Sequence, residues 1–187
     1  MKCESLGVYR RSKRVECVGE KDLYYLKRIA LKRGLGRSRL CVHPGDHSLL
    51  QEMFIVHQKG VYVRPHSHPN KSESYHVIEG QADAVFFDRH GHLTAVIPLG
   101  DPSSGRHFYC RIGESQFHTL LIRSKYFIFH EATTGPFQRS NTNFAPWAPG
   151  VENSDMHRDF MKNLEIKIKK FKTFIPKRRG KAKMKIT

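Results

Sequence analysis

Apolar and polar residues alternate over short segments through the middle of this chain, which is the pattern of half-buried β-strands. Turn signals separate the segments; in the tetrapeptide 88–91, for example, the glycine suits a left-handed position of a hairpin. The strands predicted in this way are residues 39–43, 51–57, 62–68, 74–78, 82–87, 93–98, 106–112, 118–122 and 126–131. So many short strands predict an all-β sandwich or a small closed barrel with a sheltered interior.

Helical periodicity is confined to the two ends of the chain. Residues 22–34 begin with an N-cap candidate, Asp22, have apolar residues at helical spacing and end at glycines. This pattern predicts a short helix whose apolar stripe packs on the barrel. In residues 160–175 apolar positions recur every three or four residues with lysines between them, which favours a basic amphipathic helix, although residues 164–168 also alternate as in a strand. Residues 1–20 have no sustained period and are predicted to be irregular.

The charge of the chain, a net +16 over 187 residues, is concentrated at its ends. Residues 1–39 hold 12 Lys and Arg against 4 Asp and Glu, and residues 162–187 hold 11 against 1, whereas residues 40–161 hold 10 against 12. We therefore divide the chain into an N-terminal extension with one helix (1–38), a near-neutral barrel (39–150) and a basic C-terminal tail (151–187). Attraction to polyanions is expected of the ends and not of the barrel.

Composition also excludes some classes of protein. The N-terminal residues contain no apolar stretch of the secretory kind, and no apolar run approaches the length of a membrane span. The four cysteines are scattered without a CxxC pair, which favours reduced thiols over a disulfide framework or a zinc knuckle. These features predict a cytoplasmic protein.

The candidate chemistry lies in the stretch 60–80, GVYVRPHSHPNKSESYHVIEG. His66 and His68 are two residues apart, so on a strand both imidazoles point to one face. The turn at Pro69–Ser72 reverses the chain and brings Glu73 back beside them. Two imidazoles and a carboxylate are ligands for a divalent transition metal. In a chain with twelve histidines, an incidental His-x-His pair is the alternative explanation.

The spacing of this stretch resembles the first motif of the cupin family: Gly60, five residues, His66-x-His68, four residues, Glu73, six residues and Gly80. The second cupin motif, Pro-x-Gly-x-x-His, corresponds to residues 113–118, and the resemblance implies His118 as a fourth ligand. Gly113 replaces the expected proline and Ser115 the expected glycine, which puts the loop geometry in doubt and leaves a three-ligand site as an alternative. The family implies a double-stranded β-helix, often dimeric, that holds iron, zinc, nickel or manganese.

Alternation along the predicted strands also selects candidate catalytic residues. Tyr62 and Arg64 share the face of the two histidines, and Tyr75 shares that of Glu73. The tyrosines are candidates for proton transfer, the alternative being a role in the core, and a buried Arg64 would need an anion. By the same alternation either His130 or Glu131 faces inward. Glu131 is thus an acid or base candidate unless it is a surface carboxylate.

The segments RLCVH, YVRPHSHPNKSES, HVIEG, HEATTGPF and FAPWAP are similar to the WbuC-type cupin-fold metalloproteins over residues 39–150. That bacterial family is often associated with O-antigen and other surface-polysaccharide gene clusters, so the resemblance implies a sugar or nucleotide-sugar as the small-molecule partner. The expected function is a metal-dependent isomerase or epimerase of surface-polysaccharide biosynthesis. The alternatives are an iron-dependent dioxygenase and a non-catalytic metal- or sugar-binding module.

The basic tail allows three interpretations. A solvated charged segment is the usual explanation of such a run. An amphipathic helix over residues 160–175 would instead dock on an anionic membrane surface. Nucleic-acid binding is the least favoured, because no recognised fold or aromatic interleaving supports it.

Overall fold

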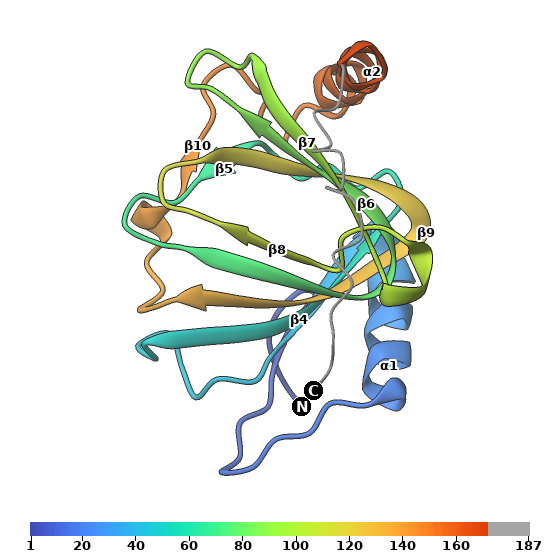
Figure 1. Ribbon diagram of the computed structural model, residues 1–187. Coiled ribbons are helices and arrows are strands. Elements are labelled where there is room, and N and C mark those ends of the chain that lie inside the picture. The colour runs from blue at the N-terminus through green and yellow to red at the C-terminus, as the bar shows by residue number, and fades with distance from the viewer. Residues whose placement is uncertain (172–187) are drawn as a thin grey trace, which may run out of the picture.

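The computed structural model describes residues 1–171 and shows a barrel built from strands that fold over one another (Figure 1). Two long antiparallel strands organise it, β6 (Glu73–Phe87) and β9 (Phe117–Thr134). They pair along nearly their whole lengths, from Glu73 opposite Thr133 to Phe87 opposite Phe117. Because each strand bends midway, the two halves of the pair belong to opposite walls of the barrel.

Shorter strands extend each wall by antiparallel pairing. The C-terminal half of β9 pairs with β4 (Leu50–Gln58), and β4 with β3 (Arg37–Cys41); the N-terminal half of β6 pairs with β8 (Tyr109–Ile112). The other wall contains β10 (Asn143–Phe144), β5 (His66–Ser67), the N-terminal half of β9, the C-terminal half of β6, and β7 (Leu93–Gly100). Of three short 3-10 helices, Lys32–Gly34 precedes β3, and the other two connect strands: Pro102–Ser104 and Arg139–Asn141.

The bend in the central pair depends on Gly80. The pairing shifts register on both sides of this residue, and Gly80 has φ of +84°, a conformation that side chains other than glycine rarely adopt. Ser124 stands opposite in β9, and its hydroxyl group hydrogen-bonds the carbonyl oxygens of Gln81 and Tyr126. The bend lets both walls enclose one apolar core, which includes Val77, Leu99, Leu120, Phe127 and Phe129.

The predicted N-terminal helix is confirmed as α1 (Glu20–Leu31). It begins two residues before Asp22, because the Asp22 carboxylate reaches back to accept a hydrogen bond from the Gly19 amide at 3.0 Å. Leu26 and Ala30 pack the helix on the outside of the β3–β4 wall. As predicted, the apolar stripe of this helix faces the barrel.

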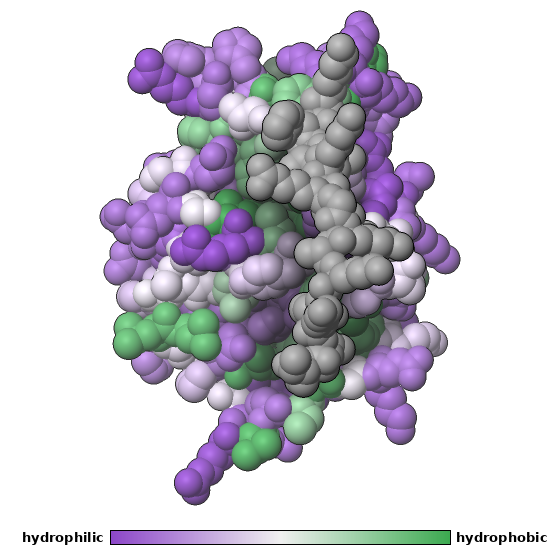
Figure 2. Space-filling model, viewed as in Figure 1, coloured by the Kyte–Doolittle hydropathy of each residue, from purple (hydrophilic) through white to green (hydrophobic). Residues whose placement is uncertain are grey.

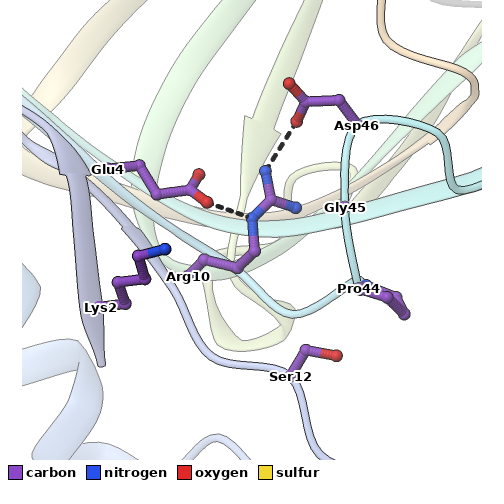
Figure 3. A pocket seen from close by; sticks show the side chains of 7 residues that line it. All are labelled: Lys2, Glu4, Arg10, Ser12, Pro44, Gly45 and Asp46. Atoms are coloured by element: carbon purple, nitrogen blue, oxygen red, sulfur yellow. Dashed lines mark hydrogen bonds and ion pairs between the residues drawn. The ribbon is translucent and has the colours of Figure 1, made fainter.

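The expectation that residues 1–20 are irregular is wrong for residues 2–10, although residues 11–19 form no helix or strand. β1 (Lys2–Ser5) and β2 (Val8–Arg10) form a hairpin, and β2 adds to the edge of β3 in parallel. Arg10 fixes this addition, since its guanidinium contacts Glu4 at 2.6 Å and Asp46 at 2.7 Å (Figure 3). These residues line a surface hollow of about 490 Å³, in which both carboxylates are already paired with Arg10. Strands this short have no periodicity to detect, and the residues of β2 lie 31 positions from their partners in β3.

The first part of the tail is helical. α2 (Ser154–Lys170) begins six residues before the predicted start, where the Asn153 side chain accepts a hydrogen bond from the Met156 amide at 3.1 Å. Its apolar positions pack on the barrel beside Trp147: Phe160, Met161, Leu164, Ile168 and Phe171. This apolar stripe is therefore occupied by the barrel and not free for a membrane surface. The remaining predicted position, Ile175, lies outside the described residues.

Polar side chains cover most of the face shown in Figure 2, and the apolar patches on it are small and separated. In residues 1–171, no helix combines the length and the apolar character that crossing a membrane requires.

Candidate metal centre

Three histidines meet inside the barrel. His66 on β5 lies directly opposite His118 on β9 in the register of the two strands, and His68 follows two residues after His66. One ring nitrogen from each histidine falls within a group whose members are all within 4.8 Å of one another. The His66 ring centroid is 4.5 Å from that of His118 and 4.9 Å from that of His68. The histidine cluster (His66, His68, His118) thus has the size of a metal-binding site.

Each histidine of the cluster is held by a backbone carbonyl at Nδ1. The three distances are 2.8 Å from His66 to the Arg64 oxygen, 3.0 Å from His68 to the Asn141 oxygen, and 2.8 Å from His118 to the Gln116 oxygen. A carbonyl only accepts, so Nδ1 donates in each ring and Nε2 is the nitrogen turned toward the site. Metal-binding histidines are commonly oriented by such a hydrogen bond at the other ring nitrogen.

Glu73 joins the cluster from the first position of β6. One carboxylate oxygen lies 2.7 Å from His118 Nε2, and the other lies 3.7 Å from His68 Nε2. The Tyr75 hydroxyl group donates a hydrogen bond to Glu73 at 3.0 Å and lies 3.3 Å from His118 Nε2. The carboxylate is therefore directed at the same space as the free nitrogens of the cluster.

The protonation states at this site suit a cation. Burial, together with the neighbouring His118, lowers the pKa of His66 to about 4, so that its imidazole is neutral at pH 7. Burial alone would raise the pKa of Glu73, but the hydrogen bond with His118 and the nearby imidazoles lower it to about 2. A neutral imidazole and an ionised carboxylate are the forms in which these two side chains bind a metal ion.

The loop before His118 keeps its shape although the sequence departs from the second cupin motif. Ser115 stands in the position of the family's glycine and has φ of +58°, the left-handed conformation that glycine favours. Its amide donates a hydrogen bond to the His68 carbonyl at 2.9 Å, and the next residue, Gln116, anchors His118. The substitution is thus accommodated by backbone strain at Ser115, and His118 still reaches the cluster.

A cavity of about 400 Å³ extends from this site and places the catalytic candidates. Arg64, Tyr75 and Glu131 line it, together with the potential ligands His66, His68 and Glu73. Tyr62 does not line it: its hydroxyl group donates to the Pro149 carbonyl at 2.9 Å, and its ring stacks on His157 of α2 at 4.8 Å.

Tyr62 is turned away because the predicted strand 62–68 exists only at His66–Ser67. Alternation therefore does not apply to residues 62–65, where Pro65 offers no amide for strand pairing.

Glu131 faces the cavity, and its neighbour His130 lies on the opposite face of β9 against Phe54, at 5.0 Å between ring centroids. Register explains the choice, since Glu131 pairs with Tyr75, whose side chain also lines the cavity. Burial, and next the charge of Glu73, raise the pKa of the Glu131 carboxyl to about 8. At neutral pH this side chain is mostly a protonated acid.

Arg39 and His57 are among the polar residues of the cavity that sequence reasoning missed. Both lie within predicted strands, but nothing in the local pattern shows which face of a strand is turned inward. The pairing of Arg39 with Ile55, an apolar residue that also lines the cavity, is the structural sign of their orientation.

A family described as "Domain of unknown function (DUF6016)" matches residues 18–99 of the chain. The matched segment contains His66, His68 and Glu73 and ends before His118. No curated protein matches the chain.

Several solved structures resemble the barrel. Protein SO0799 from Shewanella oneidensis is 10% identical with a TM-score of 0.50, and the match covers 68% of this chain and 83% of that one. KdgF from Halomonas sp. is 16% identical with a TM-score of 0.42, covering 57% and 84%. The capsular polysaccharide assembling protein CapF from Staphylococcus aureus is 14% identical with a TM-score of 0.45, covering 58% and 28%.

Some of the similar structures are much longer than this chain, which spans 22% of procruciferin from Brassica napus. The likeness therefore concerns the fold. The two antiparallel walls that share β6 and β9, together with this likeness, show an all-β cupin barrel, a double-stranded β-helix with a short N-terminal helix.

Proposed function

We propose that this protein is a metal-dependent enzyme that acts on a carbohydrate or a nucleotide-sugar in the biosynthesis of surface polysaccharide. One observation carries the proposal. Three histidines, each oriented by a carbonyl at Nδ1, converge with the Glu73 carboxylate on one small space beside the cavity. The polysaccharide context is supported by the sequence resemblance to the WbuC-type family.

The donor set fits a divalent transition metal such as iron, zinc, nickel or manganese, held by His66, His68, Glu73 and His118. When bound, such an ion supplies Lewis-acid polarisation of a substrate oxygen. The cavity provides space for a substrate beside these residues, and its volume of about 400 Å³ lies in the range of small-molecule sites.

Two side chains of the cavity, Tyr75 and Glu131, carry protons close to the proposed ligands. The Tyr75 hydroxyl group is held by Glu73 at 3.0 Å, so its proton is oriented toward the ligand set. Glu131 lies opposite Tyr75 in the pairing of β6 and β9 and is mostly protonated at neutral pH. An acid with a pKa near the working pH can both give and accept a proton, which isomerisation or epimerisation requires. We assign Glu131 as the general acid and base, with Tyr75 positioning Glu73.

The unusual pKa of Glu131 predicts how stability depends on pH. The folded-state pKa of about 8 exceeds the ordinary value of 4.5. The native protein therefore holds a proton that the unfolded chain releases, and its free energy of unfolding falls as the pH rises from about 4.5 to 8. Glu131→Gln keeps the shape without the ionisation and should remove this loss.

In metal-free protein, the stability gained by Glu131→Gln should grow from pH 5 to pH 8, reaching about 1–3 kcal/mol, and then level off. Urea unfolding at several pH values measures it. A gain that is the same at pH 5 and pH 8 would contradict the assigned ionisation.

Metal content tests the proposed function directly. Protein purified without a histidine tag and analysed by mass spectrometry should carry close to one transition-metal ion per chain. Zinc, nickel or manganese would favour Lewis-acid chemistry on a sugar. An absence of metal under every loading condition would overturn the proposal.

An iron-dependent dioxygenase is the second candidate, because three imidazoles and one carboxylate also suit iron(II). Oxygen consumption with a candidate substrate distinguishes it from isomerisation. A non-catalytic binding module is less favoured, since the departures from the second motif leave His118 in place. The cytoplasmic location and a homodimer stay predictions from the sequence.

A further inference from the structure

Residues that line the cavity carry buried polar atoms that the protein itself leaves without partners. In residues 1–171, four buried side-chain nitrogen or oxygen atoms make no hydrogen bond. Three of them belong to residues that line the cavity: Arg39 Nε, His57 Nδ1 and Arg64 Nε. Buried polar groups are normally paired, because desolvation without a partner is costly. Three such atoms in residues around one cavity indicate that a bound ligand supplies the missing hydrogen-bond partners.

Two of these residues belong to one group on adjacent strands. Arg37 and Arg39 are two residues apart on β3, so both side chains leave the same face, and Arg37 lies opposite His57 on β4. All three line the cavity, and we call them the arginine cluster (Arg37, Arg39, His57). The edge of the His57 ring rests against Phe129, at 5.6 Å between centroids, which fixes its orientation.

The cations of the cavity are not neutralised. Among the described residues, no carboxylate lies within ion-pair distance of Arg37, Arg39 or Arg64. Arg64 lies over the Phe144 ring at 4.9 Å, and its closest polar contact is the Ala145 carbonyl at 3.5 Å. The other partly buried arginines are each paired with a carboxylate: Arg10, Arg11, Arg106 and Arg123. The difference locates an excess of positive charge in the cavity.

The carboxyls of the cavity do not offset this charge. Glu73 is engaged by the histidine cluster, and among the described residues Glu131 forms no ion pair with an arginine. A fourth cation, Lys71, also lines the cavity and donates a hydrogen bond to the Pro136 carbonyl at 2.9 Å. A guanidinium presents several donors in a plane, which matches the oxygens of a phosphate or a carboxylate.

We propose that the arginine cluster is an oxyanion subsite, and that the substrate is a sugar carrying a phosphate or a carboxylate group. Guanidinium groups of Arg37 and Arg39 and the free nitrogen of His57 bind the oxyanion, and Arg64 adds charge nearer the histidines. The placement of the sugar beside the histidine cluster rests on the proposed function; the oxyanion subsite does not.

Strand register separates the subsite from the metal ligands. Arg39 is level with Ile55, Phe129 and Val77 across four strands. Val77 is four residues beyond Glu73 on β6, which is roughly 13 Å along a strand. The oxyanion therefore binds away from the metal ligands, where it anchors the substrate and contributes binding energy to its orientation.

Thermal unfolding with small probes tests the subsite. The probes are inorganic phosphate, glucose 6-phosphate, glucuronate and glucose, with ionic strength held constant by potassium chloride. A ligand that binds only the folded chain raises Tm, by about 2–4 °C at several times its Kd. We expect this rise with at least one of the oxyanions and none with glucose. Glucose 6-phosphate acting above glucuronate identifies a phosphate ester, and the reverse order identifies a sugar acid.

Matched variants locate the effect. Arg39→Gln should abolish most of the rise and weaken oxyanion binding at least about tenfold, whereas Arg111→Gln should leave both unchanged. Arg111 is exposed on β8 and lies outside this cavity, so it loses the same charge without affecting the subsite. An equal rise in Arg39→Gln, or no rise with any oxyanion, would overturn the proposal.

His66→Ala separates this inference from the proposed function. With the metal site damaged, the rise caused by oxyanions should persist. If it disappears in His66→Ala but persists in Arg39→Gln, the anion binds at the metal centre, and the subsite is refuted while the proposed metal chemistry stands.

Discussion

Replacing His66 by alanine or Glu73 by glutamine is expected to remove the bound metal and to lower turnover by about two orders of magnitude or more. Each change removes one ligand and leaves the barrel intact. His66→Ala leaves His118 without its partner across β5 and β9, and Glu73→Gln keeps the size and the hydrogen-bonding reach of the side chain but not its charge. Metal content and turnover, measured on the same preparations, should fall together.

His130→Ala is the matched control. His130 lies on β9, as does His118, but on the opposite face of the strand, with its Nε2 3.5 Å from Glu52 at a partly exposed position. It should retain full metal content, and circular dichroism should show all three variants folded. Metal retained by both His66→Ala and Glu73→Gln would place the metal elsewhere and refute this ligand set.

The local sequence pattern was sufficient to predict those features that depend on residues close together in the sequence. The spacing of His66, His68 and Glu73 predicts convergence because two strand steps and one turn separate them, and the structure brings these residues together. The helix near the N-terminus was also predictable, since its apolar positions recur over three turns. The cupin fold followed from the framing glycines and from the number of short strands.

The features that the sequence did not predict are those that depend on contacts between distant parts of the chain. The position of Tyr62 is decided by a hydrogen bond to Pro149, 87 residues away, and not by alternation. Likewise the inward face of β3 depends on its register with β4, so Arg39 carried no local sign of facing the cavity. The apolar stripe of α2 was visible in the sequence, but the surface that it covers was not.

The shape of the loop before His118 is a different case. The motif comparison gave the ligand and raised doubt about the loop, because Ser115 replaces glycine. Backbone sterics discourage this conformation in serine without forbidding it, and the hydrogen bond from the Ser115 amide to the His68 carbonyl holds it. The hydrogen bond thus outweighs the conformational preference of serine, and the loop keeps the shape that places His118 in the site.

The second large effect is expected at Gly80, where alanine should lower the free energy of unfolding by about 3 kcal/mol or more. An added Cβ would overlap the Tyr126 carbonyl oxygen and approach the Ser124 hydroxyl oxygen to 2.5 Å. The backbone at Tyr126 cannot easily withdraw, because it is paired with Gln58 on β4. Relief would require opening the bend by which β6 passes from one wall to the other.

Gly60 provides the matched control, since the two glycines frame the first motif and both have positive φ, +89° at Gly60 and +84° at Gly80. A Cβ at Gly60 would meet nothing within 4 Å, so Gly60→Ala should cost only the backbone strain, about 1–2 kcal/mol. Urea unfolding of both variants measures the difference. Equal losses would mean that strain alone accounts for both glycines; a larger loss at Gly80 would assign that glycine to the bend that brings Glu73 and His118 into one cavity.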